Sequence, residues 1–119
     1  MFKQKLTRVI NNVEGTFACM LIGFDGIAID TVYRDGEELP QLSAISVEVS
    51  NLLAKFRRLQ AYDVGEVNEV SLTTGEITTL ARVVADEYLL ILALDKDADV
   101  GRGTTMLRLI APFVEREMV

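Results

Sequence analysis

Two nearly unbroken apolar runs constrain the fold more than any other feature of this sequence. They are Thr16–Gly23 (TFACMLIG) and Tyr88–Leu94 (YLLILAL). A strand that is apolar on both faces has to be covered on both sides, so each run predicts a strand in the middle of a sheet between two layers. Three less apolar runs predict further strands, at residues 27–33, 65–73 and 77–84.

The turns between these runs predict how the strands pair. Asp25-Gly26, Thr74-Gly75 and Asp86-Glu87 stand between neighbouring runs, and such short polar turns favour antiparallel hairpins. With the two most apolar strands side by side, the strands numbered in chain order form a five-stranded antiparallel sheet in the order 2-1-5-4-3. The 65–73 strand then lies at one edge, and the 27–33 strand, with its charged Asp30, lies at the other.

Three amphipathic segments predict helices that cover this sheet, at residues 2–12, 38–62 and 104–118. In the longest, the apolar side chains recur at helical spacing and predict the buried face: Leu42, Ile45, Val49, Leu52, Phe56 and Leu59. Pro112 is expected to bend the last helix. The central helix should cover one face and the terminal helices the other, which gives one α+β domain over residues 1–119, a three-layer α/β/α sandwich with the topology αββαβββα.

A second row on the central helix consists mostly of small residues, and it is the main candidate for an interaction surface. The row is Ser43, Val47, Ser50, Ala54 and Ala61. It could be an ordinary solvated face, but charged residues would keep an exposed helix soluble more effectively, and we therefore interpret it as a contact surface. Because the exposed 65–73 edge should lie on the same flank, two copies could pair strand to strand and helix to helix, as a homodimer.

The residue inventory gives little support for an enzyme, a metal site or a cofactor site. There is no histidine and only one cysteine, Cys19, which excludes the usual general base and zinc ligand sets. The acidic segment 95–99 is interpreted as a solvated loop, and Gly101-Arg102-Gly103 as a tight helix entry. Four arginines could each be proposed as an arginine finger, but no pattern selects one of them: Arg57, Arg58, Arg82 and Arg102.

Charge and hydropathy exclude other partners. The net charge is −6, and no basic cluster along the sequence predicts binding to nucleic acid or to anionic lipid. The longest apolar run is far too short to span a membrane, and a single cysteine cannot form an intrachain disulfide. We therefore expect a cytoplasmic protein.

Over essentially its whole length the sequence resembles the roadblock/LC7 domain family. The resemblance rests on FACMLIGFDGIAI after the first helix, LSAISVEVSNLLAKF in the central helix and the closing YLLILALDKDADVGRGTTMLRLIAPFV. It implies a profilin-like or roadblock-like fold and dimers formed through the central helix and the third strand. The residues expected at the dimer or partner interface are Ser43, Val47, Ser50, Ala54, Arg57, Arg58, Ala61, Glu66, Val67, Asn68, Glu69, Val70 and Ser71.

The same resemblance implies a function. Family members regulate small GTPases, or serve as scaffold subunits or light chains. The expected function is therefore a non-enzymatic homodimeric regulator or scaffold that binds a small Ras-like GTPase through its central helices. The alternative is an adaptor or light-chain-type subunit without effect on nucleotide hydrolysis. A third possibility, a small-molecule sensor or enzyme of profilin-like architecture, would require an internal pocket lined by Asp30 or Arg82.

Overall fold

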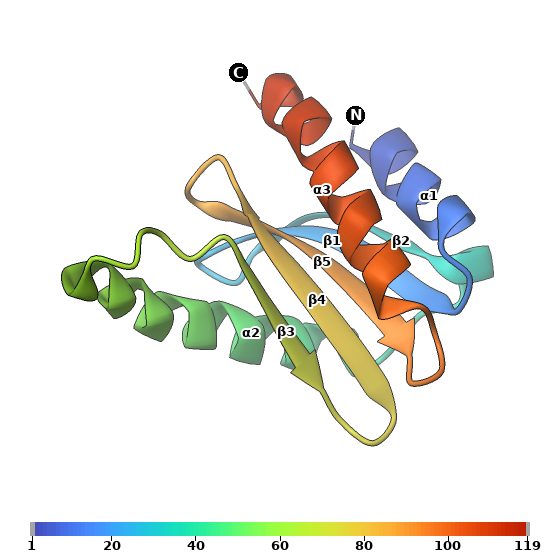
Figure 1. Ribbon diagram of the computed structural model, residues 1–119. Coiled ribbons are helices and arrows are strands. Elements are labelled where there is room, and N and C mark those ends of the chain that lie inside the picture. Colours follow the sequence, from blue (N-terminus) through green and yellow to red (C-terminus); the bar gives the residue numbers. More distant parts are fainter. Residues whose placement is uncertain (1, 119) are drawn as a thin grey trace.

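The predicted order of helices and strands is confirmed by the computed structural model, which describes residues 2–118 (Figure 1). Over these residues the elements are α1 (Lys3–Asn12), β1 (Thr16–Gly23), β2 (Ala28–Tyr33), α2 (Leu42–Phe56), β3 (Glu69–Thr73), β4 (Ile77–Val84), β5 (Tyr88–Asp95) and α3 (Val100–Glu117). Two short 3₁₀ segments, η1 (Arg34–Gly36) and η2 (Arg57–Tyr62), follow β2 and α2.

The five strands form one antiparallel sheet in the predicted order β2-β1-β5-β4-β3. The central pair is β1 and β5, where Met20 lies opposite Ile91. The strand β3 pairs only with β4 within the described residues, with Glu69 opposite Arg82. The order follows from burial, because β1 and β5 are almost wholly buried and therefore need a neighbour on each side.

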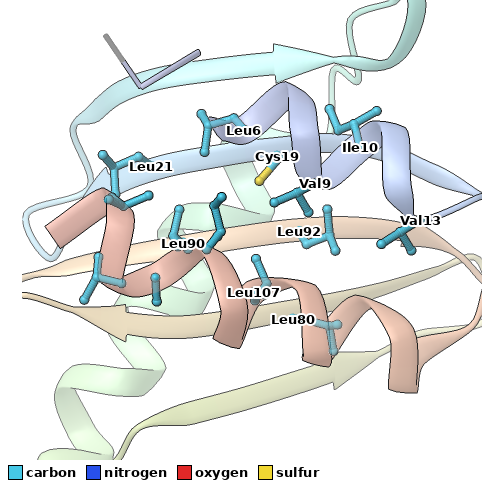
Figure 2. Close-up of a cluster of buried hydrophobic side chains, with 14 of the residues drawn as sticks. Leu6, Val9, Ile10, Val13, Cys19, Leu21, Leu80, Leu90, Leu92 and Leu107 are labelled. Carbon is cyan, nitrogen blue, oxygen red and sulfur yellow. The ribbon is translucent and has the colours of Figure 1, made fainter. Parts of the chain in front are cut away.

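Helices cover both faces of the sheet and make the predicted three layers. Figure 1 shows α1 and α3 side by side on one face and α2 on the other. Figure 2 shows the core beneath α1 and α3, which includes Leu6, Val9, Cys19, Leu90, Leu92 and Leu107. A second core lies beneath α2 and includes Ala18, Met20, Leu42, Val49, Leu53 and Ile91. Successive residues of β1 and β5 thus alternate between the two cores.

The last helix begins four residues before its predicted start at Thr104. Asp99 caps it, because its Oδ1 accepts a hydrogen bond from the Arg102 backbone N–H at 3.0 Å. Gly103 lies inside the first turns, where an added Cβ would stand 3.0 Å from Leu80 Cδ1. The glycine lets α3 approach the sheet closely, which explains the Gly-Arg-Gly segment without an anion site. The helix continues through Pro112 to Glu117.

The rotation of α2 differs from the prediction. The buried residues of α2 are Leu42, Ser46, Val49, Ser50 and Leu53, whereas Leu52 is 37% exposed, Phe56 38% and Leu59 43%. Two serines can face the core because their hydroxyls donate to carbonyls of their own helix, Ser46 to Ser43 O and Ser50 to Ser46 O, both at 2.9 Å. The α-helical spacing also ends at Phe56, because η2 follows with fewer residues per turn.

Candidate functional site

An exposed apolar surface runs along α2 and η2 and continues to the edge strand β3. We call it the α2–β3 flank and define it by its exposed large apolar side chains, Leu52, Phe56, Leu59, Tyr62 and Leu72. Val67 and Val70 pack against the core beneath α2, and they connect the start of β3 to this side of the sheet. Clusters of exposed apolar side chains on such a scale commonly mark interaction sites.

The edge strand β3 adds backbone groups to this surface. Its one neighbour among the described strands is β4, so the opposite side of β3 presents N–H and C=O groups that are able to pair with another strand. Alternation along the strand directs Val70 and Leu72 towards the α2 face and Glu69 towards the α3 face. The flank therefore offers an apolar helix face and an open strand edge together.

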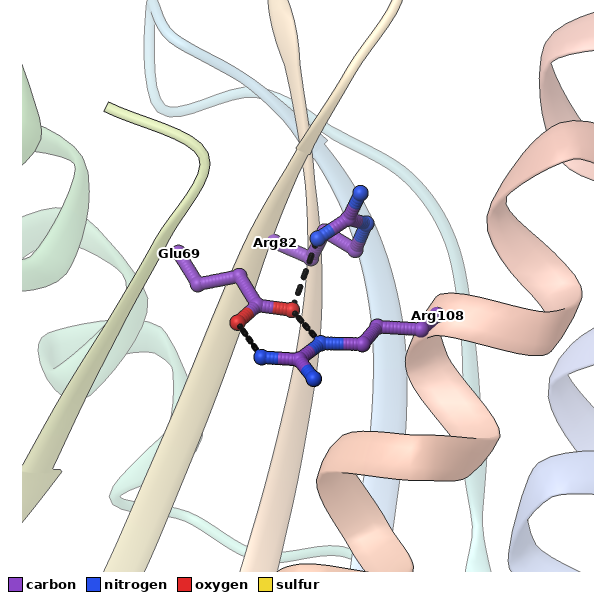
Figure 3. Close-up of polar contacts among 3 residues, drawn as sticks. All are labelled: Glu69, Arg82 and Arg108. Atoms are coloured by element: carbon purple, nitrogen blue, oxygen red, sulfur yellow. Dashed lines mark hydrogen bonds and ion pairs between the residues drawn. The ribbon is translucent and has the colours of Figure 1, made fainter. Parts of the chain in front are cut away.

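A carboxylate with two arginine partners holds this edge strand in place. Arg108 of α3 donates to both carboxylate oxygens of Glu69, at 2.7 Å from Nη2 and 2.8 Å from Nε. Arg82 of β4 donates to Glu69 Oε2 at 2.7 Å (Figure 3). The hydrogen bond from Arg108 is the main cause that lowers the pKa of the Glu69 carboxyl. Glu69, which was predicted at the interface, therefore points towards α3 and fastens β3 to its own domain.

Three of the four arginines that were considered as arginine fingers make contacts within the chain. Arg57 lies 4.1 Å from the centre of the Phe24 ring and donates to the Asp86 carbonyl. Arg82 binds Glu69, and Arg102 Nε donates to the Asn12 carbonyl at 2.5 Å. Arg58 lies exposed on η2. Extending Arg57, Arg82 or Arg102 into the nucleotide site of a GTPase as an arginine finger would require breaking these contacts.

The structure divides the remaining predicted interface residues by exposure. Ser43, Val47, Ala54, Ala61, Glu66, Asn68 and Ser71 are exposed, and Val67 and Val70 are half-buried. Ser50 is a correction, because it is 2% exposed and lies against the sheet. Sequence periodicity missed the large side chains of the flank, Leu52, Phe56 and Leu59, because it placed them in the core. The sequence carried no clear signal of this exposure, because large apolar side chains usually indicate a buried face, and the face that is buried contains Ser46 and Ser50.

The third possibility, a small-molecule site in a pocket lined by Asp30 or Arg82, is poorly supported, and the open hollows of about 450 and 710 Å³ elsewhere on the surface are lined by neither residue. Arg82 does line a pocket of about 240 Å³ between β3, β4 and α3, but this volume is below the range of ~300–1,000 Å³ that is usual for ligand pockets. Among residues 2–118, no group of three or more His, Cys, Asp or Glu side chains is arranged to hold a metal ion. No helix in the described part of the chain is long and apolar enough to cross a membrane.

Comparison with known proteins gives matches among solved structures. No family model matches the sequence, and no curated protein matches it. MglC from Myxococcus xanthus is 41% identical, with 98% of each chain covered and a TM-score of 0.71. The gliding protein MglB from Thermus thermophilus is 16% identical over 96% of this chain and 85% of its own, with a TM-score of 0.83. A roadblock/LC7 domain from Streptomyces avermitilis is 17% identical over 98% and 97%, with a TM-score of 0.78.

Proposed function

Because this chain belongs to the roadblock/LC7 family, we propose that it is a non-enzymatic homodimeric regulator or scaffold, which binds a small Ras-like GTPase through its paired central helices. The observation that carries the proposal is the α2–β3 flank, where an exposed apolar helix face lies beside an open strand edge. The proposed site of action is the cytoplasm.

The dimer step rests on the self-complementary character of the flank. A twofold axis beside β3 would pair the strand with its copy in antiparallel fashion and bring the two α2 helices together, so the same residues serve both subunits. The helix has 15 residues, a length of ~22 Å, and β3 has 5 residues, a length of ~17 Å. Leu52, Phe56 and Leu72 would leave water in such a contact, and burial of apolar area is the main driving force of association.

The GTPase step rests on what the paired helices would still expose. Ser43, Ala44 and Ala54 give one side of α2 short exposed side chains, beside the outward-facing Glu48, Asn51 and Lys55, and another protein can pack closely onto that side. Because Arg57, Arg82 and Arg102 make internal contacts, this chain would act by stabilising one conformation of the GTPase switch loops. The GTPase would supply its own catalytic groups.

The internal arginine contacts also favour the alternative, in which the protein is an adaptor subunit without effect on nucleotide hydrolysis. GTP hydrolysis by the small Ras-like GTPases of the source organism, measured with and without this protein, separates the two functions. An altered rate supports the regulator. Stable binding with an unchanged rate supports the adaptor.

The test of the surface uses two phenylalanines on opposite faces. Phe56→Asp places a charge in the α2–β3 flank, and Phe113→Asp places one on α3, where Phe113 is 49% exposed. Light scattering should give twice the 13.2 kDa monomer mass for the wild type and for F113D, and the monomer mass for F56D. A dimer of unchanged stability in F56D, with unchanged GTPase binding, would refute this interface.

A further inference from the structure

The helix α3 lies on the side of the sheet opposite α2 (Figure 1), and its outward face carries a second pair of exposed large apolar side chains. Leu109 is 60% exposed and Phe113 is 49% exposed. Residues three or four apart lie on one face of a helix, so Leu109 and Phe113 share a face with Arg102 and Thr105 before them and with Arg116 after them. We call these five residues the α3 stripe: Arg102, Thr105, Leu109, Phe113 and Arg116.

The layer that contains the stripe is basic, although the chain as a whole is acidic. The helices α1 and α3 contain six basic residues, Lys3, Lys5, Arg8, Arg102, Arg108 and Arg116, and two acidic ones, Glu115 and Glu117. Their combined charge is thus positive in a chain with a net charge of −6, although Arg108 is paired with Glu69 of β3 and Lys3 lies 4.0 Å from Asp30 of β2. Folding creates this asymmetry, because it brings together two helices from opposite ends of the sequence.

Both arginines of the stripe are positioned by contacts within the chain. The Arg116 guanidinium lies over the Phe113 ring, 5.2 Å from its centre, and Arg102 Nε donates to the Asn12 carbonyl. Fourteen residues separate them on one helix, a distance of ~21 Å. The stripe is therefore a pair of apolar side chains between two oriented positive charges, with no acidic residue among its five members.

We propose that the α3 stripe is a docking surface for an acidic amphipathic helix of another protein. Such a helix would pack apolar side chains on Leu109 and Phe113 and place carboxylates near Arg102 and Arg116. Arginine with carboxylate is a strong and geometrically specific pair, and a helix presents its anchors at the same spacing as the stripe. Because this surface lies across the sheet from the α2–β3 flank, the protein would hold two partners at once.

Charge distinguishes this occupant from two others. A second copy docked through the same stripe would bring arginines towards arginines, which is unfavourable. An anionic bilayer would meet the whole layer, including the exposed Asp97 and Asp99 beside the start of α3, and these carboxylates would be repelled from it. A narrow helix covers only the stripe and meets these carboxylates at one end, where Arg102 lines a pocket together with them.

The experiment is a titration of the ¹⁵N-labelled full chain, followed by its amide chemical shifts. The probe is a synthetic helical peptide with two leucines in the middle of one face and a glutamate at each end of that face. The control peptide has lysines in place of the glutamates. The variant L109S/F113S tests the surface, and I29S is the matched variant, because Ile29 is also exposed, at 44%, but lies on β2.

The expected result is a set of shift changes confined to residues 102–116 with the acidic peptide. The dissociation constant should be at least about tenfold higher for L109S/F113S and for the lysine peptide, and unchanged for I29S. Shifts elsewhere, or none at about 1 mM peptide, would overturn the proposal. The proposal would also be overturned if the protein sedimented with phosphatidylserine vesicles, or if the wild type formed an assembly larger than a dimer that the L109S/F113S substitutions abolished. The mass of L109S/F113S in solution distinguishes the two proposals. A dimer of L109S/F113S without peptide binding concerns the α3 stripe alone, whereas a monomeric wild type would count against the α2–β3 flank.

Discussion

The rotation of α2 gives the sharpest prediction, because it separates two adjacent leucines. Leu53 is fully buried beneath α2, and Leu52 is 37% exposed. Replacing Leu53 with alanine removes three fully buried carbons, worth ~0.8 kcal/mol each in transfer free energy, and leaves a cavity. We expect L53A to lower the free energy of unfolding by about 3–4 kcal/mol. L52A loses part of that transfer term and leaves no enclosed cavity, so about 1–1.5 kcal/mol is expected.

Both substitutions should be measured in the F56D variant, so that any dimer contact of Leu52 does not contribute. Urea denaturation followed by circular dichroism gives the free energies. The melting temperature should fall by about 14 °C for L53A and about 5 °C for L52A, since ~1 kcal/mol corresponds to ~4 °C in a domain of this size. Equal costs, or a larger cost for L52A, would mean that the helix faces the sheet as the sequence periodicity predicted, and the assigned flank would then be wrong.

Three further predictions test local features. E69Q should lower the free energy of unfolding by about 1 kcal/mol at neutral pH. The folded-state pKa of Glu69 lies below its ordinary value of 4.5, so the stabilisation by the ionised carboxylate is present above that pH and is lost as the pH falls through the lowered pKa. The acid denaturation curves of E69Q and wild type should therefore converge at low pH. G15A should cost about 1–3 kcal/mol in thermal unfolding, since Gly15 has φ +80° and an added Cβ would stand 2.9 Å from Ala98 Cβ; an unchanged melting temperature would contradict this. Cys19 should resist iodoacetamide in the native protein and react after unfolding, because burial raises the pKa of its thiol to about 12; rapid native labelling by mass spectrometry would show that β1 is not enclosed.

The sheet order could be predicted from the sequence because two strands as apolar as β1 and β5 can lie only in the middle of the sheet. Residues such as Leu21 and Leu90 lie in strands that are apolar on both faces, and the hairpin turns then place the other strands. The rotation of α2 could not be predicted in the same way. Ser46 and Ser50 resemble surface residues in sequence, and only the hydrogen bonds to their own helix make them suitable for the core.

The positions of the charged side chains relative to one another could not be predicted from the sequence, for a different reason. Glu69 lies 13 residues from Arg82 and 39 from Arg108, so no local spacing brings the three side chains together. The positive layer is equally hidden, because half of its basic residues lie in α1 and half in α3, and these two helices from opposite ends of the chain meet only in the fold. Net charge along the sequence therefore missed a basic surface that the fold creates.

The contact between Glu69 and Arg108 ties the open edge of the sheet to the outer helix. The strand cannot slide relative to α3 without losing two short charge-assisted hydrogen bonds. A protein bound at the edge of β3 and a peptide bound on α3 would therefore contact two elements that the Glu69–Arg108 pair joins. Any strengthening or weakening that one exerts on the other must be reciprocal, by the same factor in both directions.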